Sequence, residues 1–382
     1  AEPASGSTGG SLRTELGSLA ADNSGNGGLF VIEKDGLTLN ATTLAGVGVG
    51  AGALSLTLLT GDLQVAGAVK STATGTDSGH ILLSAQQGSV TLAANLVSGS
   101  GSISVLAQDA LRIGVASSAR VQTQAAGQTV ELQAGGALTM GAGASIVTNN
   151  GAQRLVANNG AVELGLLDAG TGAVAVHASG AISDAQGDAD TAVNVRAASL
   201  RLQAGGDAGS GINAIETAVG RLSAEVGGGL FVVEDDALEL AGSAVSVNRV
   251  KADGTVIGST VGDAALTGLW AGADLMVDNG RTGDGVLVVS EAVTAAGSVT
   301  LLAQGAITQS AAGGISAGGA GTVDVQSFTG AIAMADGAVA QTAGGNVRYA
   351  AATTLTLGEI DAGMGSVSLV AGGSILDNVT EA

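Results

Sequence analysis

The stretch Gly297-Ser-Val-Thr-Leu-Leu-Ala-Gln-Gly-Ala-Ile-Thr308 belongs to a series that repeats in the last third of the sequence. Its first part, a glycine followed by an alternating apolar pair, occurs four times, as Val299-Thr-Leu301, Val323-Asp-Val325, Val347-Arg-Tyr349 and Val367-Ser-Leu369. The spacings are 323 − 299 = 24, 347 − 323 = 24 and 367 − 347 = 20 residues. This regular recurrence indicates a repeat architecture.

Each repeat contains two further apolar positions. The second follows eight or nine residues after the first, at Ile307, Ile332, Leu355 and Ile375. The third lies at Ile315, Val339 and Ile360. The first half of the chain shows the same cadence less regularly, for example at Ile103-Ser-Val105 and Val130-Glu-Leu132. Each repeat is therefore expected to hold three short strands.

Short strands separated by small residues can bury their apolar sides only by stacking on the next repeat. If each repeat is one turn of a coil, every strand pairs in parallel with the strands above and below it. The sequence predicts an all-β fold, a right-handed parallel β-helix or β-solenoid, with three strands per turn of about 20–27 residues. At roughly 22 residues per turn, 382 residues would make about 17 turns.

A series of β-sandwiches is the alternative fold. Asn150-Gly151 and Asn159-Gly160 fit hairpin turns between antiparallel strands. Hairpins alone give no reason for a period of three strands, so the solenoid is favoured.

A longer duplication divides the chain. Gly28-Leu-Phe-Val-Ile-Glu33 returns as Gly229-Leu-Phe-Val-Val-Glu234 at an offset of 201. Upstream of each copy, apolar residues at i, i+4 and i+7 suggest one face of a helix. These residues are Leu12, Leu16 and Leu19 in the first copy and Ile215, Val219 and Leu222 in the second. We expect two modules of a longer tandem protein, residues 1–198 and 199–382, opened by short helices near residues 11–20 and 213–224.

The composition argues against several classes of function. The chain has 13 Lys and Arg against 33 Asp and Glu, a net charge of −20, which disfavours nucleic acid as a partner. It has no Cys and two His, so thiol chemistry and soft metal ligands are lacking. Residues 36–61 are uncharged, but they alternate with the period of a strand, which argues against membrane insertion. We expect no enzyme activity, because basic residues are few and scattered.

Acidic loops are the candidate metal sites. Asp184, Asp188 and Asp190 lie in one loop and offer the oxygen ligands that Ca²⁺ prefers. A second loop carries Asp278, Asn279 and Asp284. Neither matches an EF-hand, and the alternative is that both are solvated loop acids. The run Glu234-Asp-Asp236 is interpreted as a surface run beside a strand.

Two large side chains and one irregular region stand out. Trp270 and Phe328 are each expected to fill a wide coil or cover the core, because exposed aromatics are costly. Residues 245–290 keep the repeat poorly, and residues 250–256 resemble an excursion from it. A ligand site, if the chain has one, is expected in this region.

The repeats resemble a known family. The segments at residues 365–377, 297–308 and 345–350, with Gly-Ser-Val or Gly-Asn-Val followed by an apolar alternation, are similar to the repeats of giant bacterial surface adhesins of the filamentous-haemagglutinin-like type. The resemblance covers the whole chain and rests on small, common residues. It implies a β-helix stalk that is secreted to the bacterial cell surface or extracellular matrix and acts in adhesion, aggregation or biofilm.

The sequence therefore leaves two expected functions for this chain. The first is a structural shaft of an exported adhesin or matrix fibre, whose partners are neighbouring modules, other copies of itself and a surface or glycan receptor of unknown identity. The second is a Ca²⁺-dependent or carbohydrate-binding self-association module.

Overall fold

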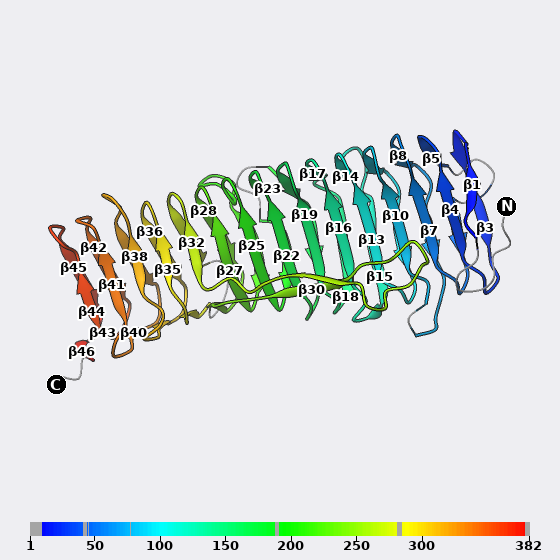
Figure 1. Cartoon of the computed structure of the whole chain (residues 1–382). Helices are drawn as coiled ribbons and strands as arrows, with labels where there is room; N and C mark the ends of the chain where they lie inside the picture. Colours follow the sequence, from blue (N-terminus) through cyan, green and yellow to red (C-terminus); the bar gives the residue numbers. More distant parts are fainter. Residues whose placement is uncertain are drawn as a thin grey trace. The chain divides into compact units, whose positions relative to one another are not determined.

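The computed structural model describes residues 10–40, 44, 46–76, 78–187, 191–280 and 285–378. These residues form strands, turns and loops, and contain no helix. Parallel strands stack coil on coil as a β-solenoid of about 14 turns with about three strands per turn (Figure 1). The predicted all-β solenoid is confirmed, and its hand stays a prediction. Turns are fewer than the expected 17 because residues between Leu240 and Leu269 leave the repeat and because some coils are longer than 22 residues, such as the 81 − 54 = 27 residues from Leu54 to Ile81.

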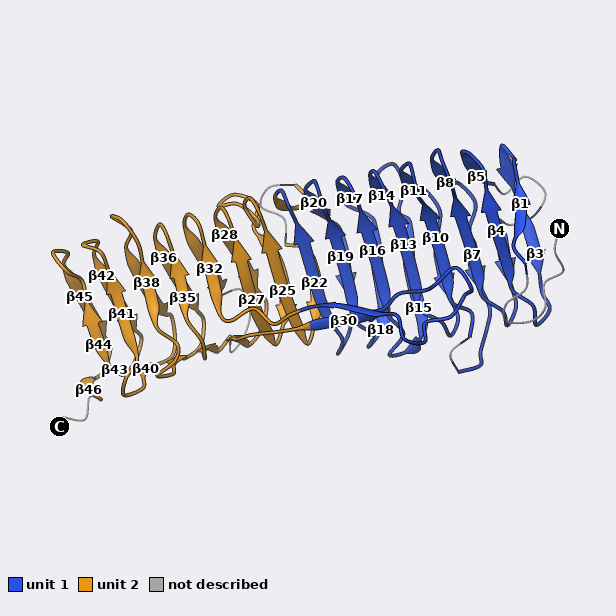
Figure 2. Cartoon of the chain, in the orientation of Figure 1, with its two compact units in different colours: residues 1–180, 184–186, 245–263 blue, residues 181–183, 187–244, 264–382 orange. Residues whose placement is uncertain are grey.

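The chain divides into two compact units (Figure 2). Unit 1 comprises residues 1–180, 184–186 and 245–263, and unit 2 comprises residues 181–183, 187–244 and 264–382. Strand β23 (Ile182–Asp184) contributes residues to both. The module boundary near residue 198 rests on the duplicated sequence and stays a prediction.

Unit 1 has three parallel sheets, one for each strand of a coil. The first sheet contains β1 (Leu12–Thr14), β4 (Leu29–Glu33), β7 (Leu54–Leu58), β10 (Ile81–Ala85), β13 (Ile103–Ala107), β16 (Val130–Ala134), β19 (Gln153–Ala157) and β22 (Ala173–Ala178). The second contains β2 (Ser18–Leu19), β5 (Leu37–Leu39), β8 (Leu63–Val65), β11 (Val90–Leu92), β14 (Leu111–Ile113), β17 (Leu138–Met140) and β20 (Val162–Leu164). The third contains β3 (Ala21–Asn23), β6 (Val47–Val49), β9 (Val69–Ser71), β12 (Leu96–Ser98), β15 (Arg120–Ala126), β18 (Ser145–Asn149) and β21 (Leu166–Asp168).

Unit 2 also has three series of parallel strands. One contains β24 (Val195–Ala197), β26 (Ile215–Val219), β28 (Leu230–Glu234), β33 (Leu275–Asn279), β36 (Val299–Ala303), β39 (Val323–Ser327), β42 (Val347–Ala351) and β45 (Val367–Ala371). A second contains β25 (Ser199–Ala204), β27 (Arg221–Val226), β32 (Leu269–Ala271), β35 (Val293–Ala295), β38 (Ile315–Ala317), β41 (Val339–Thr342) and β44 (Glu359–Asp361). A third contains β29 (Leu238–Leu240), β34 (Leu287–Val289), β37 (Ile307–Gln309), β40 (Ile332–Met334), β43 (Leu355–Leu357) and β46 (Ile375–Asp377).

The core of unit 2 is a column of equivalent aliphatic side chains. Val299 pairs with Val323, and Val323 pairs with Val347, so each valine stacks on the next. All three are at most 1% exposed, whereas Asp324 and Arg348, one position along, are only half-buried. Alternating residues point to opposite sides of a strand, so one set fills the coil and the other faces outward. The four strands predicted from the repeat, which begin at Val299, Val323, Val347 and Val367, are confirmed.

The third predicted ladder is displaced by one residue. Ala340, rather than Val339, pairs with Ile315 on one side and Ile360 on the other. Ala340 is fully buried and Val339 is half-buried. A slip of one residue exchanges the inward and outward sets, and two adjacent apolar residues do not reveal which of them points inward.

The predicted helices near residues 11–20 and 213–224 are wrong. The first segment forms β1 and β2, and the second forms β26 and β27. Ile215 and Val219 are four residues apart, a spacing that also puts both on the inward side of one strand. Leu222 lies beyond Gly220, in the next strand, so the helical face was a coincidence of two strands.

The sandwich alternative is also excluded. Asn150, with φ of 60°, turns the chain between β18 and β19. These strands do not pair with each other: β18 pairs in parallel with β15 and β21, and β19 pairs with β16 and β22. The Asn-Gly dipeptide is therefore a corner of the coil and not a hairpin.

Replacing Val347 with Asp is expected to destabilise the protein by more than about 3 kcal/mol, because it buries an unpaired carboxylate between two valines. The matched control is Arg348→Ala on the same strand. Arg348 pairs with Asp324 at 2.8 Å, and both side chains are half-buried and open to solvent, so its loss should cost less than about 1 kcal/mol. Urea unfolding measures both, and similar losses for the two variants would contradict the assignment of inward and outward positions.

Candidate functional sites

The predicted calcium loops lie partly outside the described residues. Asp184 is 6% exposed in β23, and its Oδ1 accepts a hydrogen bond from the Gln186 amide at 3.0 Å. Asp188 and Asp190 are not among the residues that the structure describes. In the part of the chain that is described, no group of three His, Cys, Asp or Glu could hold a metal ion. Calcium binding by Asp184, Asp188 and Asp190 stays a prediction.

The second acidic loop is also only partly described. Asp278 Oδ1 accepts from the Gly280 amide at 2.9 Å, and Asn279 Nδ2 donates to the Val286 carbonyl at 2.9 Å. Both side chains thus hold the local loop, and Asp284 lies outside the described residues.

The predicted excursion is confirmed and forms an antiparallel hairpin, here called the arm (residues 245–263). Its strands β30 (Val245–Asn248) and β31 (Thr260–Asp263) pair with each other. The chain leaves the coil after β29 and returns at β32, and these two strands pair with successive parts of β27. The excursion thus interrupts one strand position of the coil.

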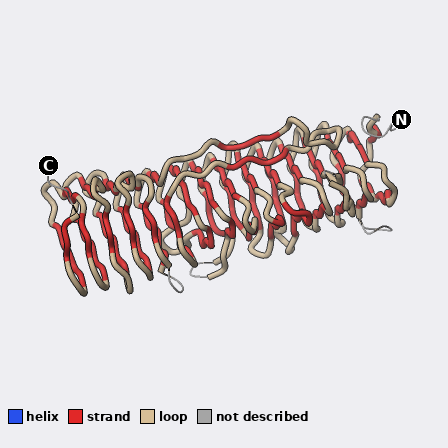
Figure 3. The backbone as a smooth tube through the Cα atoms, turned by 90° about the horizontal axis from the view of Figure 1, so that it is seen from below, coloured by secondary structure: helices blue, strands red, loops and turns tan. Residues whose placement is uncertain are grey.

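The arm lies on the first sheet of unit 1 and runs across its strands (Figure 3). Its contacts bury outward positions of that sheet: Ser104 and Glu131 are 0% exposed, although both point away from the coil interior. For comparison, the outward residues Thr300 and Asp324 of unit 2 are only half-buried. The arm therefore provides a second buried layer outside the coil.

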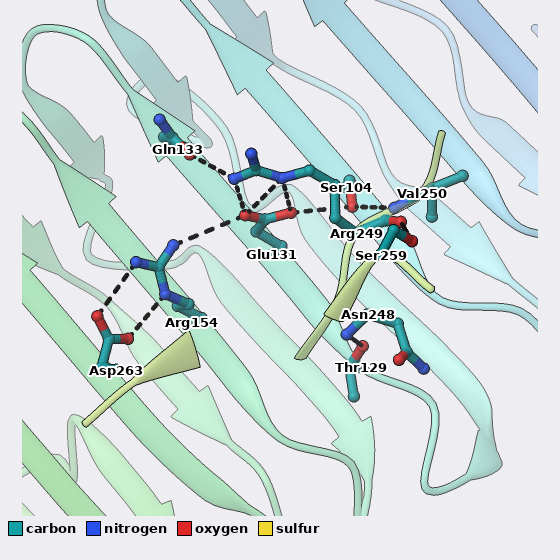
Figure 4. A network of polar contacts seen from close by, with 10 residues as sticks. All are labelled: Ser104, Thr129, Glu131, Gln133, Arg154, Asn248, Arg249, Val250, Ser259 and Asp263. Atoms are coloured by element: carbon teal, nitrogen blue, oxygen red, sulfur yellow. Dashed lines mark hydrogen bonds and ion pairs between the residues drawn. The ribbon is translucent and has the colours of Figure 1, made fainter. Parts of the chain in front are cut away.

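Glu131 is the centre of the polar contacts under the arm (Figure 4). The Arg249 guanidinium binds both of its carboxylate oxygens, with Nε at 3.0 and 2.9 Å, and also reaches Gln133. Arg154 lies 3.6 Å from the same carboxylate. Ser104 donates to Glu131 at 3.3 Å and accepts from the Val250 amide at 2.9 Å. The carboxylate raises the pKa of Arg249 above its ordinary value, so this arginine is charged.

A second ion pair fixes the base of the arm. Arg154 Nε and Nη2 donate to the two oxygens of Asp263 at 2.7 and 3.1 Å, a bidentate geometry. With Arg249 and Glu131, two guanidinium groups therefore face two carboxylates. Mutual pairing is the condition under which charged groups tolerate burial.

The tip of the arm reaches the first coils. Gly254 has φ of 74°, and a Cβ there would lie 2.5 Å from the Cβ of Ala53 and 3.0 Å from the Phe30 ring. Glycine is therefore required by both the backbone conformation and the close approach. From Asp263 at β19 to Gly254 at β4, the arm links coils that the solenoid joins only through their neighbours.

Glu33 and Glu234, which occupy duplicated positions in the sequence, are both buried. Glu33 accepts from Thr14 Oγ1 at 2.6 Å and from the Leu16 amide at 3.1 Å. Glu234 accepts from Thr217 Oγ1 at 2.6 Å and from the Val219 amide at 3.0 Å. Both carboxylates therefore tie their own strand to the end of the paired strand in the preceding coil. The matching Thr residues, 203 positions apart (217 − 14), are a signal that the sequence contains.

The interpretation of Glu234 as part of a surface run was wrong, because its side chain is 0% exposed. Burial raises the pKa of Glu234 to about 7, against the opposing effect of the hydrogen bonds from Thr217 and Val219. The protonated form can donate to Thr217, whose hydroxyl also lies 3.3 Å from the Val233 carbonyl. The geometry thus accommodates a neutral carboxyl group.

The two histidines lie in separate coils of unit 1. His80 is 4% exposed, and its Nδ1 accepts from the Ser102 amide at 2.9 Å. His177 lies half-buried in β22. Asp77, the acid beside His80 in the sequence, is outside the described residues.

The expectation that Trp270 and Phe328 cover the core is wrong. Each is 44% exposed. Leu269 and Ala271 point inward at 1% and 0% exposure, so Trp270 between them points outward. The alternation Leu-Trp-Ala in the sequence already indicated that Trp270 points outward.

Replacing Arg249 with Met is expected to destabilise the protein by about 2–3 kcal/mol, because it removes the main partner of the buried Glu131. The double variant Glu131→Met with Arg249→Met should recover most of the loss, since no buried charge then lacks its partner. Urea unfolding of the single and double variants tests this coupling. Additive losses would contradict it.

Glu234 predicts a stability that falls as the pH rises. Its folded pKa of about 7 is above the unfolded value, so the folded state binds the extra proton and its stabilisation is lost as the pH rises through about 7. We expect the melting temperature to fall between about pH 5 and pH 8, and Glu234→Gln to flatten this slope. Exposed Glu359→Gln is the control. An unchanged slope in Glu234→Gln would contradict the assignment.

No helix in the described part of the chain meets the length and apolarity needed to span a bilayer. Compared with protein-family models, curated proteins and solved structures, the chain matches none of them.

Proposed function

We propose that the chain is a structural shaft segment of an exported bacterial adhesin or extracellular matrix fibre, acting in cell adhesion, aggregation or biofilm. The observation that carries the proposal is the continuous stacking of equivalent residues from coil to coil, for example Val299 on Val323 and Val323 on Val347. Each coil uses the backbone groups of its neighbours, so added repeats add length without requiring a new core.

The arm supports the same role. It contacts strands from β19 to β4 through ion pairs, backbone hydrogen bonds and close packing at Gly254. A stack joined only by nearest neighbours can open one coil at a time, whereas an element that crosses several coils makes their opening cooperative. We infer that this part of the shaft is reinforced against loss of single coils.

The resemblance of the repeats to filamentous-haemagglutinin-like adhesins supports the proposed location at the cell surface or in the extracellular matrix. The net charge of −20 favours partners other than polyanions. Neighbouring modules, other copies of the chain and a surface receptor are the partners that we propose.

A Ca²⁺-dependent or carbohydrate-binding module is the second candidate. The exposure of Trp270 favours its carbohydrate-binding form, because an exposed aromatic ring is a common anchor for a ligand. Its calcium-dependent form would require Asp184, Asp188 and Asp190 to bridge an ion.

Chelation separates the shaft from the calcium-dependent module. If the shaft proposal is correct, adding EDTA leaves the melting temperature and the sedimentation coefficient unchanged, because stacked coils need no metal. A metal-bridged module loses stability or dissociates, and Asp184→Asn should reproduce that loss without EDTA. A fall in melting temperature of several degrees with EDTA, reversed by added Ca²⁺, would contradict a metal-independent shaft.

A further inference from the structure

Trp270 forms one wall of a groove on unit 2. The groove has a volume of about 380 Å³. It lies between the outward side of β27 and β32 and the segment that leads the chain back into the coil. Its lining residues are Ala224, Glu225, Ala265, Leu266, Thr267 and Trp270.

The returning segment is held in place at both ends. Arg201 Nε donates to the Ala264 carbonyl at 2.8 Å, and Glu291 accepts from the Gly268 amide at 2.6 Å. The Ala224 amide, on the floor of the groove, donates to the Gly268 carbonyl at 3.1 Å. The wall formed by residues 265–267 therefore lies between fixed points, as in a preformed binding site.

Gly268 makes this turn possible. Its φ is 64°, and a Cβ there would lie 2.0 Å from the Ala292 carbonyl oxygen. No other residue fits without moving the backbone. The turn brings the chain back to β32 and sets the outward direction of Trp270 opposite the segment 265–267.

The lining chemistry suits a sugar ring. Glu225 and Trp270 are register partners on adjacent strands, so a carboxylate lies beside an indole ring. A pyranose has an apolar C–H face that can pack on an aromatic ring and a rim of hydroxyl groups. Glu225 can accept hydrogen bonds from such hydroxyls, and Thr267 can donate or accept one.

The charge of the lining limits the class of sugar that the groove can bind. The lining contains Glu225 and no Lys or Arg. The whole chain carries a net charge of −20. A sulfated or uronic-acid glycan would meet the Glu225 carboxylate with no Lys or Arg in the lining to offset it, whereas a neutral hexose glycan would not be repelled.

Outward hydroxyl groups on the neighbouring coils extend the polar surface beyond the groove. Trp270 pairs with Thr294, and Thr294 pairs with Ser316, so hydroxyl groups follow the indole on the outward side of successive strands. Strands in a sheet are about 4.8 Å apart, which is comparable to the length of one pyranose unit in an extended chain. A short oligosaccharide could therefore contact the groove and the next coils together.

We propose that the groove at Trp270 binds neutral hexose oligosaccharides, with Trp270 as the stacking residue and Glu225 and Thr267 as hydrogen-bonding residues. The site specifies the ligand class of the second candidate function and does not depend on whether unit 2 belongs to a shaft. It requires no metal, so its failure and that of the shaft proposal are distinguishable.

Trp270 is the only tryptophan of the chain, so its fluorescence reports on this groove alone. Titration of the full chain with cellotetraose and with maltotetraose is expected to give a saturable change with at least one of them, at a Kd of about 1 mM or tighter. Tetragalacturonate, an anionic oligosaccharide of the same length, should give none. No saturable change with either neutral oligosaccharide would overturn the proposal, and equal binding of tetragalacturonate would overturn the assigned ligand class.

Calorimetry of variants tests the residue roles. Trp270→Ala should abolish measurable binding, and Glu225→Gln should weaken it about tenfold through loss of hydrogen bonds to a charged acceptor. Phe328→Ala is the matched control, because Phe328 is equally exposed but does not line the groove. Circular dichroism confirms that each variant is folded. Binding retained in folded Trp270→Ala, or lost in Phe328→Ala, would overturn the assigned site.

Discussion

Parallel hydrogen bonding between successive coils is the constraint on which the structure depends. It places each residue on its equivalent in the next coil, so the interior consists of columns such as Val299, Val323 and Val347. Most columns hold aliphatic side chains that fit one narrow layer, and Tyr349, fully buried between Val325 and Leu369, is an exception. This explains a core of small aliphatic residues in a chain with five aromatic residues, and a single proline among 382 residues, since proline cannot donate to the ladder.

The arm adds contacts of a different kind. Coil stacking joins residues about one repeat apart, whereas Arg249 and Glu131 are 118 residues apart in the sequence. The arm buries polar groups on the outward side of a sheet, and it does so where they are paired with each other or with backbone amides. Thr129, for example, accepts from the Asn248 amide at 2.9 Å. Specific polar contacts therefore set the position of the arm, together with the packing of Val247 and Val250, which are each 1% exposed.

The difference between inward and outward positions follows from the alternation of side chains along each strand. Inward positions are restricted by the columns, and outward positions are free to differ from one coil to the next. On the first sheet of unit 1, the outward residues form the surface on which the arm packs. On β27 and β32 of unit 2 they place Glu225 beside Trp270. Function in such a fold depends on outward residues rather than on the solenoid itself, which is why fold and function need separate arguments.

The sequence by itself determined the coil. Its period predicted parallel strands and the inward valines, because burial of one face requires an apolar residue at every second position. It did not distinguish Val339 from Ala340, or a helix from two successive strands at Ile215, Val219 and Leu222, because adjacent apolar residues and a spacing of four fit both interpretations. The sequence showed the excursion as a loss of period, but it did not show which sheet the excursion packs on. Only the tertiary structure decided that Arg249 meets Glu131, that Glu234 is buried and that Trp270 lines a groove. Periodicity records which side of a strand a residue occupies, whereas what covers that side is decided by segments distant in the sequence.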